Sequence, residues 1–377
     1  MSSAIAQNKL VATLPGAYYY APEIYAQEIE RIFGQMWVCV ERAEQVPQPG
    51  DFITVEVGGE SLIVVRGRDH QLRAFYNACR HRGAQLTGAA CGNAKALTCT
   101  YHAWTYGLDG RLQGAPNIAS FGDFPREQFG LLPVALEVWE GLIWLNLADD
   151  PPPLHEQLAA PIRERFGALD QFARYGLGDL ALGKRIAYDV HANWKLVVEN
   201  FMECYHCAPM HPELCALLPA FRNGTSYQGL VGVGTAFADD VAQFSLSGKG
   251  NRPRLPGLTD ADDRTYFGPT LAPNVLISLL PDHIIVHTAQ PHGPEQTHVT
   301  CDWLFDPAVA AAQDFDPSDS VEIFDIVNKQ DWEVCELTQR GVRSKAFARG
   351  GVYVPSEQHI LQFNNLVRER LGVAVTP

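Results

Sequence analysis

Two short stretches decide how this chain folds: CRHRGAQL, which begins at Cys79, and CTYHAWTYGLDGRL, which begins at Cys99. Each stretch pairs its cysteine with a nearby histidine, as Cys79-x-His81 and Cys99-x2-His102. One thiolate and one imidazole from each loop make a set of two sulfur and two nitrogen ligands. Such a set suits either tetrahedral zinc or a two-iron cluster.

The order of the ligands separates these two kinds of metal site. Zinc fingers group like ligands, commonly as C-x2-4-C with H-x3-5-H, whereas each loop here mixes one cysteine with one histidine. In a Rieske centre both thiolates bind one iron and both imidazoles bind the other, so two mixed loops that approach from opposite sides fit it. The spacing therefore favours a Rieske [2Fe-2S] cluster over zinc.

Both stretches closely resemble the cluster-binding loops of Rieske-type non-haem iron oxygenases. The resemblance implies that Cys79 and Cys99 bind one iron of the cluster and that His81 and His102 bind the other. Cys91 lies between the loops, matches neither ligand position and is expected to be structural. A cluster of this kind passes on single electrons, and its nitrogen ligands raise its potential to roughly −150 to +300 mV.

The sequence around these loops predicts short β-strands. FITVEV and SLIVV flank Gly58-Gly59 and predict a hairpin, and ALEVWEGLIWLNL predicts another that turns near Gly141. The run ADDPPP at 148–153 ends this region, because successive prolines remove donors and restrict the residues before them. We therefore expect an N-terminal all-β Rieske domain over residues 38–150.

The rest of the chain, residues 1–37 and 151–377, is expected to form the catalytic domain. Strand-like runs such as RIAYDVH, NVLISLL and HIIVHTA alternate there with predicted helices, one starting at Pro22 and another over about residues 320–339. This mixture predicts an α+β fold, with an antiparallel sheet flanked by helices.

The stretch ECYHCAPMH, Glu203 to His211, offers one carboxylate, two thiols and two imidazoles. It continues a predicted helix from about Asn193, on which Glu203 and His206 would lie along one side. His211 is five residues beyond His206, about 140° around an ideal helix, so Pro209 must interrupt the helix if both rings are to reach one ion. A carboxylate from elsewhere would complete the two-histidine, one-carboxylate set of non-haem Fe(II) oxygenases.

Helical periodicity identifies a candidate for this carboxylate in SVEIFDIVNKQDWEVCELTQRG, residues 320–341. The predicted inner stripe of this helix consists of Val327, Val334, Cys335 and Thr338. Asp331 falls on the stripe, whereas the other charged residues of the helix fall elsewhere. Gly341 is expected to end the helix as its C-cap.

Both segments resemble ligand segments of the same oxygenase family: ECYHCAPMH its carboxylate-x2-His-x4-His motif, and NKQDWEVCE the segment with the third ligand. The resemblance implies that His206, His211 and Asp331 bind a mononuclear iron. It makes Glu203 the catalytic carboxylate that links this centre to the cluster of a neighbouring subunit, and so it implies a homotrimer. Many members have aspartate there, and glutamate resembles the variant in enzymes that act on quaternary ammonium compounds.

The resemblance implies a terminal mono- or dioxygenase that activates O2 at Fe(II) with electrons from the cluster. We expect it to hydroxylate or N-demethylate a small quaternary ammonium or betaine-like compound, with Phe201, Tyr205 and Phe221 as cage walls. Ring dihydroxylation of an aromatic acid is the alternative, because the same rings could stack on such a substrate. The chain has no Gly-rich dinucleotide fingerprint, so NAD(P)H is expected to act through a separate flavin-dependent reductase, with or without a ferredoxin.

Two interpretations from other functional classes remain open. The chain could be a Rieske-type electron carrier with no mononuclear iron, or a zinc-binding protein that uses Cys204 and Cys207 with His211 or Cys215. Glu203 could also simply pair within the core. Six further histidines lack ligand spacing and are expected to be core or surface residues: His191, His283, His287, His292, His298 and His359. Of these, His287 and His292 are candidates to line the pocket.

Composition excludes several other classes of protein. The net charge is −14 and the sequence has no Lys/Arg run, which argues against nucleic acid as a partner. The apolar runs are too short for a membrane span. The first residues lack the charged start and apolar segment of a secretory signal, which favours the cytoplasm. In that compartment the 9 cysteines are expected to be ligands or thiols rather than disulfides.

Overall fold

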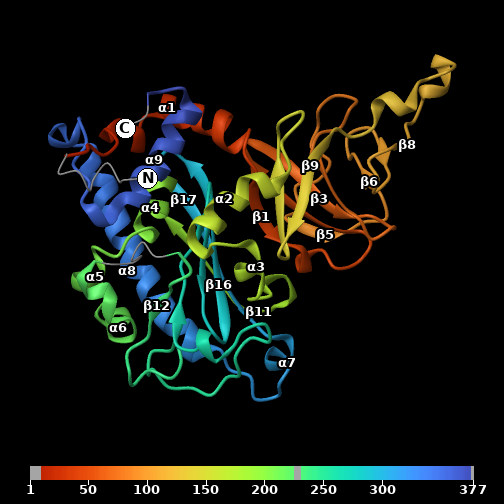
Figure 1. Cartoon of the computed structure of the whole chain (residues 1–377). Coiled ribbons are helices and arrows are strands. Elements are labelled where there is room, and N and C mark those ends of the chain that lie inside the picture. The colour runs from red at the N-terminus through yellow and green to blue at the C-terminus, as the bar shows by residue number, and fades with distance from the viewer. Residues whose placement is uncertain (1–9, 225–230, 375–377) are drawn as a thin grey trace. The chain divides into compact units, whose positions relative to one another are not determined.

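The computed structural model describes residues 10–224 and 231–374. The chain divides into two compact units (Figure 1). One unit, Ile29–Leu154, is called the β unit below, and the other, Met1–Glu28 with His155–Pro377, is called the α+β unit. The β-rich N-terminal part and the mixed C-terminal part confirm the predicted fold class.

Within the described residues, the β unit is built on a seven-stranded antiparallel sheet in the order β1-β10-β9-β4-β3-β2-β5. The strands are β1 (Val38–Arg42), β2 (Asp51–Val57), β3 (Glu60–Arg66), β4 (Leu72–Tyr76), β5 (Cys91–Asn93), β9 (Pro133–Trp139) and β10 (Leu142–Asn146). Both predicted hairpins, β2–β3 and β9–β10, are present. Gly58 and Gly59 turn the first with φ of 59° and 80°, a left-handed conformation that favours glycine.

A smaller antiparallel sheet of the β unit carries the second cysteine loop, whereas the first follows β4 of the larger sheet. The strands of the smaller sheet are β6 (Leu97–Thr98), β7 (Thr105–Tyr106) and β8 (Leu112–Gly114), and the β6–β7 hairpin encloses Cys99 and His102. The helical turns of the unit are η3 (Ile29–Phe33, a π-helix), η4 (Ala43–Gln45), η5 (Ile118–Phe121) and η6 (Arg126–Phe129). Each cysteine loop therefore begins where a strand ends.

The α+β unit contains a second antiparallel sheet, in the order β11-β17-β16-β15-β14. The strands are β11 (Ala181–Val190), β14 (Thr270–Leu271), β15 (Val275–Leu279), β16 (His283–Gly293) and β17 (Gln296–Phe305), with β12 (Thr235–Ala236) and β13 (Thr265–Tyr266) as a separate pair. The helices are α1 (Pro22–Glu28), α2 (Leu154–Phe166), α3 (Leu169–Ala173), α4 (Trp194–Phe201), α5 (Cys207–Met210), α6 (Pro212–Leu217), α7 (Pro307–Ala310), α8 (Ser318–Val342) and α9 (Gln358–Leu371). Short helical turns are η2 (Gly16–Tyr19), η7 (Leu177–Asp179), η8 (Pro219–Asn223), η9 (Asp260–Asp262), η10 (Lys345–Phe347) and η11 (Pro355–Glu357).

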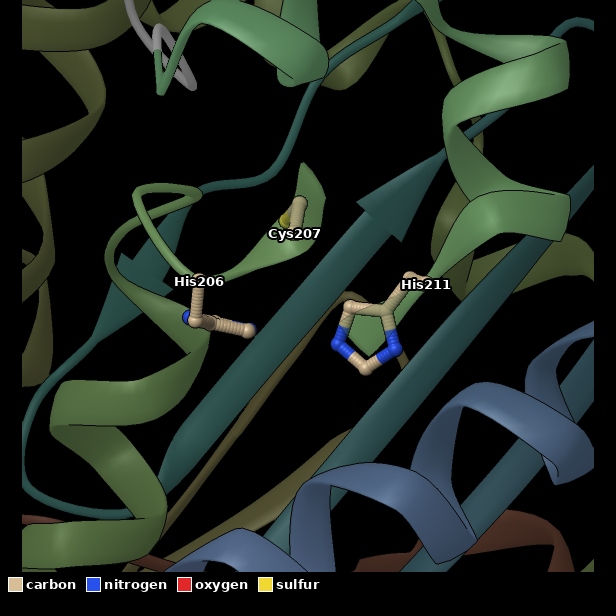
Figure 2. A group of neighbouring side chains, drawn as sticks. All are labelled: His206, Cys207 and His211. Carbon is tan, nitrogen blue, oxygen red and sulfur yellow. The ribbon is translucent and has the colours of Figure 1, made fainter. Parts of the chain in front are cut away.

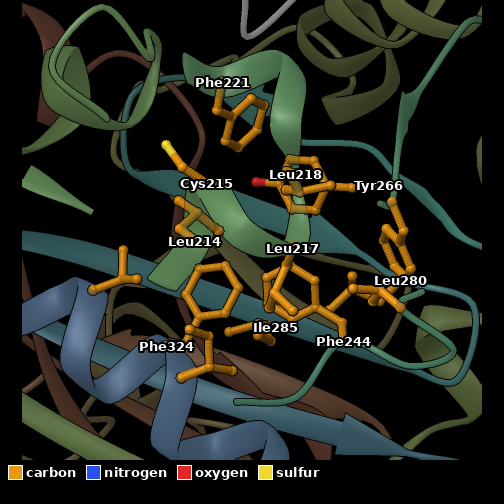
Figure 3. Packing of buried hydrophobic residues seen from close by; sticks show 14 of the residues in the cluster. Leu214, Cys215, Leu217, Leu218, Phe221, Phe244, Tyr266, Leu280, Ile285 and Phe324 are labelled. Atoms are coloured by element: carbon orange, nitrogen blue, oxygen red, sulfur yellow. The ribbon is translucent and has the colours of Figure 1, made fainter. Parts of the chain in front are cut away.

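One face of this sheet packs against α8. Side chains alternate between the two faces of a strand, so Ile285 and His287 of β16 lie on the same face. They pair across the sheet with Trp303 and Cys301 of β17. Trp303, Cys301 and Ile285 form one buried cluster with side chains of α8 and of the segment that contains α6 and η8, and Figure 3 shows part of it. This core holds the polar ring of His287 in apolar surroundings.

Two helix predictions need correction, and a C-terminal helix was missed. Helix α4 begins after Asn193, whose side chain accepts a hydrogen bond from the backbone N–H of Lys195, but it ends at Phe201 rather than continuing through the histidines. The carboxylate of Glu203 accepts the N–H groups of two following residues, which takes these donors away from a helical ladder. Helix α8 continues to Val342, so Gly341 is not its cap, and α9 was not predicted.

Among the described residues, no helix combines the length and the apolar character that crossing a bilayer requires. The first nine residues, on which the expectation about a secretory signal largely rests, lie outside the described residues.

Candidate active site

The two cysteine loops of the β unit bring their histidines together. The ring centroids of His81 and His102 are 4.7 Å apart, at an interplanar angle of 75°. Cys79 and Cys99 are 4% and 2% exposed and belong to one apolar cluster, whereas His81 is exposed and His102 is partly exposed. The loops thus direct their thiols into the core and their imidazoles toward the surface, as two different iron positions require.

Both loops use the same backbone turn. The carbonyl oxygen of Cys79 accepts a hydrogen bond from the N–H of Gly83 at 2.9 Å, and that of Cys99 accepts one from Ala103 at 3.0 Å. Gly83 and Ala103 both have positive φ, 74° and 56°. Each loop is therefore closed directly behind its histidine, which fixes cysteine and histidine relative to each other.

Tyr106 of β7 is a neighbour of the cluster loops that the sequence reasoning missed. Its hydroxyl oxygen accepts a hydrogen bond from the N–H of Arg80 at 3.0 Å and lies 3.3 Å from Sγ of Cys79. Burial, together with the hydrogen bond to Cys79, raises the pKa of Tyr106 well above its usual value, so the hydroxyl keeps its proton. It can donate that proton to the sulfur of Cys79, and hydrogen bonds of this kind help to set a cluster's potential.

A second centre lies in the α+β unit. Figure 2 shows the rings of His206 and His211 beside each other, and their centroids are 5.1 Å apart. Oδ1 of Asp331 lies 3.3 Å from Nε2 of His206 and 2.9 Å from Nε2 of His211. His211 and Asp331 are separated by 120 residues in the sequence. The structure therefore brings the three expected iron ligands to one point.

The outer nitrogens of both rings are held by hydrogen-bond acceptors. Nδ1 of His206 contacts the carboxylate of Glu203, and Nδ1 of His211 lies 2.7 Å from Oε1 of Gln330. These oxygens accept, so each Nδ1 carries a hydrogen, and the Nε2 atoms of both rings face Asp331. The sequence reasoning missed Gln330, because an amide next to the expected ligand has no signal until its burial and direction are known.

The charges around this centre favour a bound cation. Burial acts to lower the pKa of His206, but hydrogen bonds to Asp331 and Glu203 outweigh burial and raise the pKa to about 10. Burial acts to raise the pKa of Asp331, yet its hydrogen bonds to both histidines hold that pKa below its usual value. One carboxylate and two imidazole nitrogens around one point, with a second carboxylate on the outer nitrogen of His206, fit a divalent metal of the two-histidine, one-carboxylate type.

Cys207 lies within the same group but cannot act as a thiolate ligand. Its sulfur is within 4.8 Å of ring nitrogens of His206 and His211 (Figure 2). It forms a disulfide with Cys204, with the two Cα atoms 4.9 Å apart. The C-x2-C zinc site considered from the sequence is therefore not formed, and the expectation that the cysteines avoid disulfides is wrong for this pair. The turn after α4 brings the two sulfurs together.

The other cysteines in question also stay outside this centre. Cys215, the remaining zinc-ligand candidate, is buried in the apolar cluster that packs against α8. Cys91, expected to be structural, is exposed on β5.

A pocket opens beside the second centre. It is bordered by Glu203, His206, His211 and Asp331, and its empty space, with the open solvent at its mouth, is about 610 Å³. Its aromatic walls are Phe201, Phe221, Tyr266, Phe324 and Trp332. Figure 3 shows three of these, Phe221, Tyr266 and Phe324, in the adjoining core.

Some of the residues expected to line this pocket do so, and others do not. Phe201 and Phe221 do line it, but Tyr205 is 61% exposed on the turn after α4 and is not one of its walls. His287 lines the pocket and is 1% exposed, whereas His292, farther along β16, is exposed. The sequence reasoning missed Asn328, a buried amide of α8 that also borders the pocket.

Two family models match the chain. The model described as Rieske [2Fe-2S] domain matches residues 36–129, and the model described as ring hydroxylating alpha subunit (catalytic domain) matches residues 177–373.

Similar proteins are found among both curated sequences and solved structures. The glycine betaine monooxygenase oxygenase subunit of Chromohalobacter salexigens is 33% identical over 369 residues, which cover 90% of this chain and 81% of that protein. The carnitine monooxygenase oxygenase subunit of Escherichia coli (strain K12) is 38% identical over 200 residues, 53% of this chain and 52% of that one. A quaternary ammonium Rieske monooxygenase solved with its substrate L-carnitine has a TM-score of 0.74 at 28% identity, and the match covers 97% of both chains. Naphthalene 1,2-dioxygenase from Rhodococcus sp. shares the fold, with a TM-score of 0.70 at 20% identity over 96% of this chain and 94% of that one.

Proposed function

Because this chain belongs to the Rieske non-haem iron oxygenases, as an alpha subunit with a [2Fe-2S] domain and an iron-dependent catalytic domain, we propose that it hydroxylates or N-demethylates a small quaternary ammonium compound. The observation that carries this proposal is the aromatic wall of the pocket beside Asp331 and the two histidines. The relatives named above include a glycine betaine and a carnitine monooxygenase subunit, and the proposed substrate is of the same chemical class.

The pocket chemistry favours a cation over an aromatic acid. Aromatic faces attract quaternary ammonium groups through their quadrupole. Glu203 and Asp331 add negative charge, and none of the lining residues that the structure describes is a lysine or an arginine. An aromatic acid has no cationic head group for these faces and carboxylates to attract, whereas each betaine-like compound has one. These features argue against the alternative of aromatic-acid dihydroxylation.

We propose that His206, His211 and Asp331 hold the mononuclear iron. When bound, the iron supplies dioxygen activation and the cluster supplies electrons. Glu203 and Gln330 keep hydrogens on the outer nitrogens of the two rings, so both Nε2 atoms stay free for the metal. The aromatic walls hold the cationic head group and exclude water from it.

The proposal assigns the cluster to residues 38–150, with Cys79, His81, Cys99 and His102 as its ligands. Residues 1–37 and 151–377 form the catalytic domain. Both cysteines are buried in one cluster and both histidine rings meet near the surface, which supports this assignment.

We further propose a homotrimer in which Glu203 links His206 to a cluster histidine of the neighbouring subunit. The contact between Glu203 and Nδ1 of His206 supports this role, and the side chain of Glu203 is 12% exposed. A solved relative, a quaternary ammonium Rieske monooxygenase, is described as using inter-subunit electron transfer.

Oxygenase components of this family take electrons from a separate reductase. We propose a flavin-dependent reductase that uses NAD(P)H, with or without a ferredoxin, and a cytoplasmic location for the complex.

The direct test supplies iron-loaded protein with a surrogate reductase and NADH. Oxygen uptake and formaldehyde release are measured with glycine betaine, L-carnitine and γ-butyrobetaine, and with benzoate as an aromatic acid. We expect substrate-dependent oxygen uptake with at least one of the methylammonium compounds. Turnover with the aromatic acid alone would contradict the proposed substrate class, and an absence of cluster or mononuclear iron would contradict the oxygenase itself.

A further inference from the structure

A row of hydrogen-bonded side chains runs from Asp325 to His287 at the pocket wall. The donor and the acceptor of each hydrogen bond can be assigned along this row, beginning at Asp325. Oδ2 of Asp325 accepts a hydrogen bond from Nζ of Lys329 at 2.6 Å, as an acceptor in an ion pair. The hydroxyl of Tyr188 lies 2.8 Å from Oδ1 of Asp325. Burial is the main cause that raises the pKa of Tyr188 far above its usual value, so the hydroxyl keeps its hydrogen. Tyr188 therefore donates that hydrogen to Asp325.

The next member of the row is Asn328. Since the hydrogen of Tyr188 is used, its oxygen can only accept, and the atom of Asn328 that faces it at 3.3 Å must be the donor Nδ2. The amide cannot be turned around without placing its oxygen against an oxygen that has no hydrogen to offer. Oδ1 of Asn328 therefore faces Nε2 of His287, at 3.0 Å.

This contact decides which nitrogen of His287 carries the hydrogen. An amide oxygen only accepts, so Nε2 of His287 is the donor. Sγ of Cys301 lies 3.1 Å from the same Nε2 and can share the hydrogen as a weak acceptor. Burial raises the pKa of the Cys301 thiol, which therefore carries no charge that would change this arrangement.

The other nitrogen of His287 is then a lone-pair acceptor. Burial lowers the pKa of His287 to about 4, against smaller opposing effects from Asn328 and Asp331, so the ring is neutral at pH 7. Nδ1 is buried, and it has no hydrogen-bond partner among the residues that the structure describes. The ring lines the pocket. A buried acceptor without a partner at a pocket wall points to a ligand group that donates.

We propose that His287 is a substrate-binding residue whose Nδ1 accepts a hydrogen bond from a hydroxyl group of the substrate. The identity of that substrate as a quaternary ammonium compound rests on the function proposed above. Asn328 and Asp331 are three residues apart on α8, so one helix face holds both the residue that orients His287 and a proposed iron ligand. The pocket thereby recognises two groups of one molecule: a cationic head by its aromatic walls and a hydroxyl by His287.

The best probes are L-carnitine and γ-butyrobetaine, because they differ by one hydroxyl group. Their affinities for the iron-loaded full chain are measured by anaerobic calorimetry, which needs no turnover. We expect the wild type to bind L-carnitine about 10-fold more tightly, the contribution of one well-made hydrogen bond. His287→Phe keeps a ring of similar size without the acceptor and should bring the ratio to about 1.

Two further variants separate this role from a structural one. His292→Phe makes the same substitution at an exposed histidine of the same strand and should keep the wild-type ratio. Tyr188→Phe removes a single oxygen from the row, frees the amide of Asn328 to turn, and should lower the ratio part of the way. Tyr188 is thus a positioning residue, and its variant keeps the test decisive if His287→Phe does not fold.

Equal affinities of the wild type for the two probes, or an unchanged ratio in both His287→Phe and Tyr188→Phe, would overturn the proposal. Neutron diffraction from deuterium-exchanged holoenzyme gives a readout that needs no substrate. A deuteron on Nε2 of His287 supports the assignment, and one on Nδ1 overturns it. If neither probe binds, the proposed substrate class fails, and the neutron result still decides the role of His287.

Discussion

The cluster loops and the mononuclear centre bring their proposed metal ligands together in opposite ways. The proposed cluster ligands come from two short loops of one β-rich unit, each closed by its own backbone turn. The proposed ligands of the second centre come from α5 and its flanking turns and from the middle of α8, with 120 residues between His211 and Asp331. The first site is therefore encoded locally, and the second depends on how α8 packs against the rest of its unit.

The two sites also differ in their depth within the protein. In the β unit the imidazoles of the proposed cluster ligands lie toward the surface, where electrons can enter. In the α+β unit the side chains of His206, His211 and Asp331 are 17%, 1% and 14% exposed. An enclosed centre with an adjacent pocket suits chemistry that must exclude water. Histidine is thus a proposed ligand in both sites, in the more exposed one for electron transfer and in the more enclosed one for oxygen chemistry.

The strongest way to break this comparison is Asp331→Ala. We expect oxygen uptake with substrate to fall by at least about 1,000-fold, because two histidines without the carboxylate no longer hold the metal that supplies the chemistry. The visible absorption of the cluster should be unchanged, since its ligands belong to the other unit. Glu333→Ala, at an exposed acidic residue of the same helix, is the matched control and should leave turnover intact. Retained turnover in Asp331→Ala would show that another carboxylate completes the site.

The dependence of folding stability on pH tests whether His287 is buried and neutral at the pocket wall. The pKa of His287 is about 4 in the folded protein against 6.5 for the free side chain, because burial disfavours the charged ring. Between these values the unfolded chain binds the extra proton, so stability falls as the pH drops from 6.5 to 4, by roughly 3 kcal/mol from this group. His287→Phe should therefore flatten the dependence of the urea midpoint on pH. A slope equal to that of wild type would contradict a buried neutral ring, and His292→Phe serves as the control.

A smaller effect is expected from Glu203→Gln, which keeps the size of the side chain and removes its charge. The outer nitrogen of His206 loses a charged acceptor, and changes of this kind beside metal ligands typically cost about 10- to 100-fold in metal affinity or activity. Iron content and turnover of the purified variant are measured together with the cluster spectrum. A fall in turnover at full iron content would sharpen the comparison, because it would assign Glu203 to the connection between the two centres. No change in either quantity would remove Glu203 from the mechanism.

The smallest expected effect tests the cluster side through Tyr106→Phe. Loss of the hydroxyl 3.3 Å from the sulfur of Cys79 should lower the reduction potential, by roughly tens of millivolts, because a hydrogen bond to sulfur stabilises the reduced cluster. The potential is measured by redox titration of the visible spectrum. The iron content of the mononuclear centre should stay the same. An unchanged potential would mean that the hydroxyl does not donate to the sulfur.

The difference between the two sites explains how far sequence reasoning could reach. The C-x-H and C-x2-H loops and both hairpins of the β unit depend on neighbours in the sequence, so spacing and turn residues predicted them. Periodicity identified Asp331 as a candidate, in agreement with the family resemblance, because one helix face is still a local property. The predicted stripe around it was only partly right: Val327 and Cys335 are buried, whereas Thr338 is exposed.

The errors fall where side chains compete with regular structure. A helix through Glu203 was expected from the apolar pattern, but the carboxylate of Glu203 accepts the nearby N–H groups and helps to end the helix at Phe201. That change of direction exposes Tyr205 and joins Cys204 to Cys207. Hydrogen bonds between a side chain and its own backbone are difficult to read from periodicity.

The sequence by itself determined the order of β and α+β regions and the family, and it predicted the two ligand sets, because each rests on spacing along the chain. Only the tertiary structure decided which atoms face which. It placed Gln330 behind His211 and Asn328 behind His287, and so selected the nitrogen that carries each hydrogen. The physical reason is that a hydrogen bond has a direction, which depends on partners brought together from distant parts of the chain by the packing of α8 against its sheet.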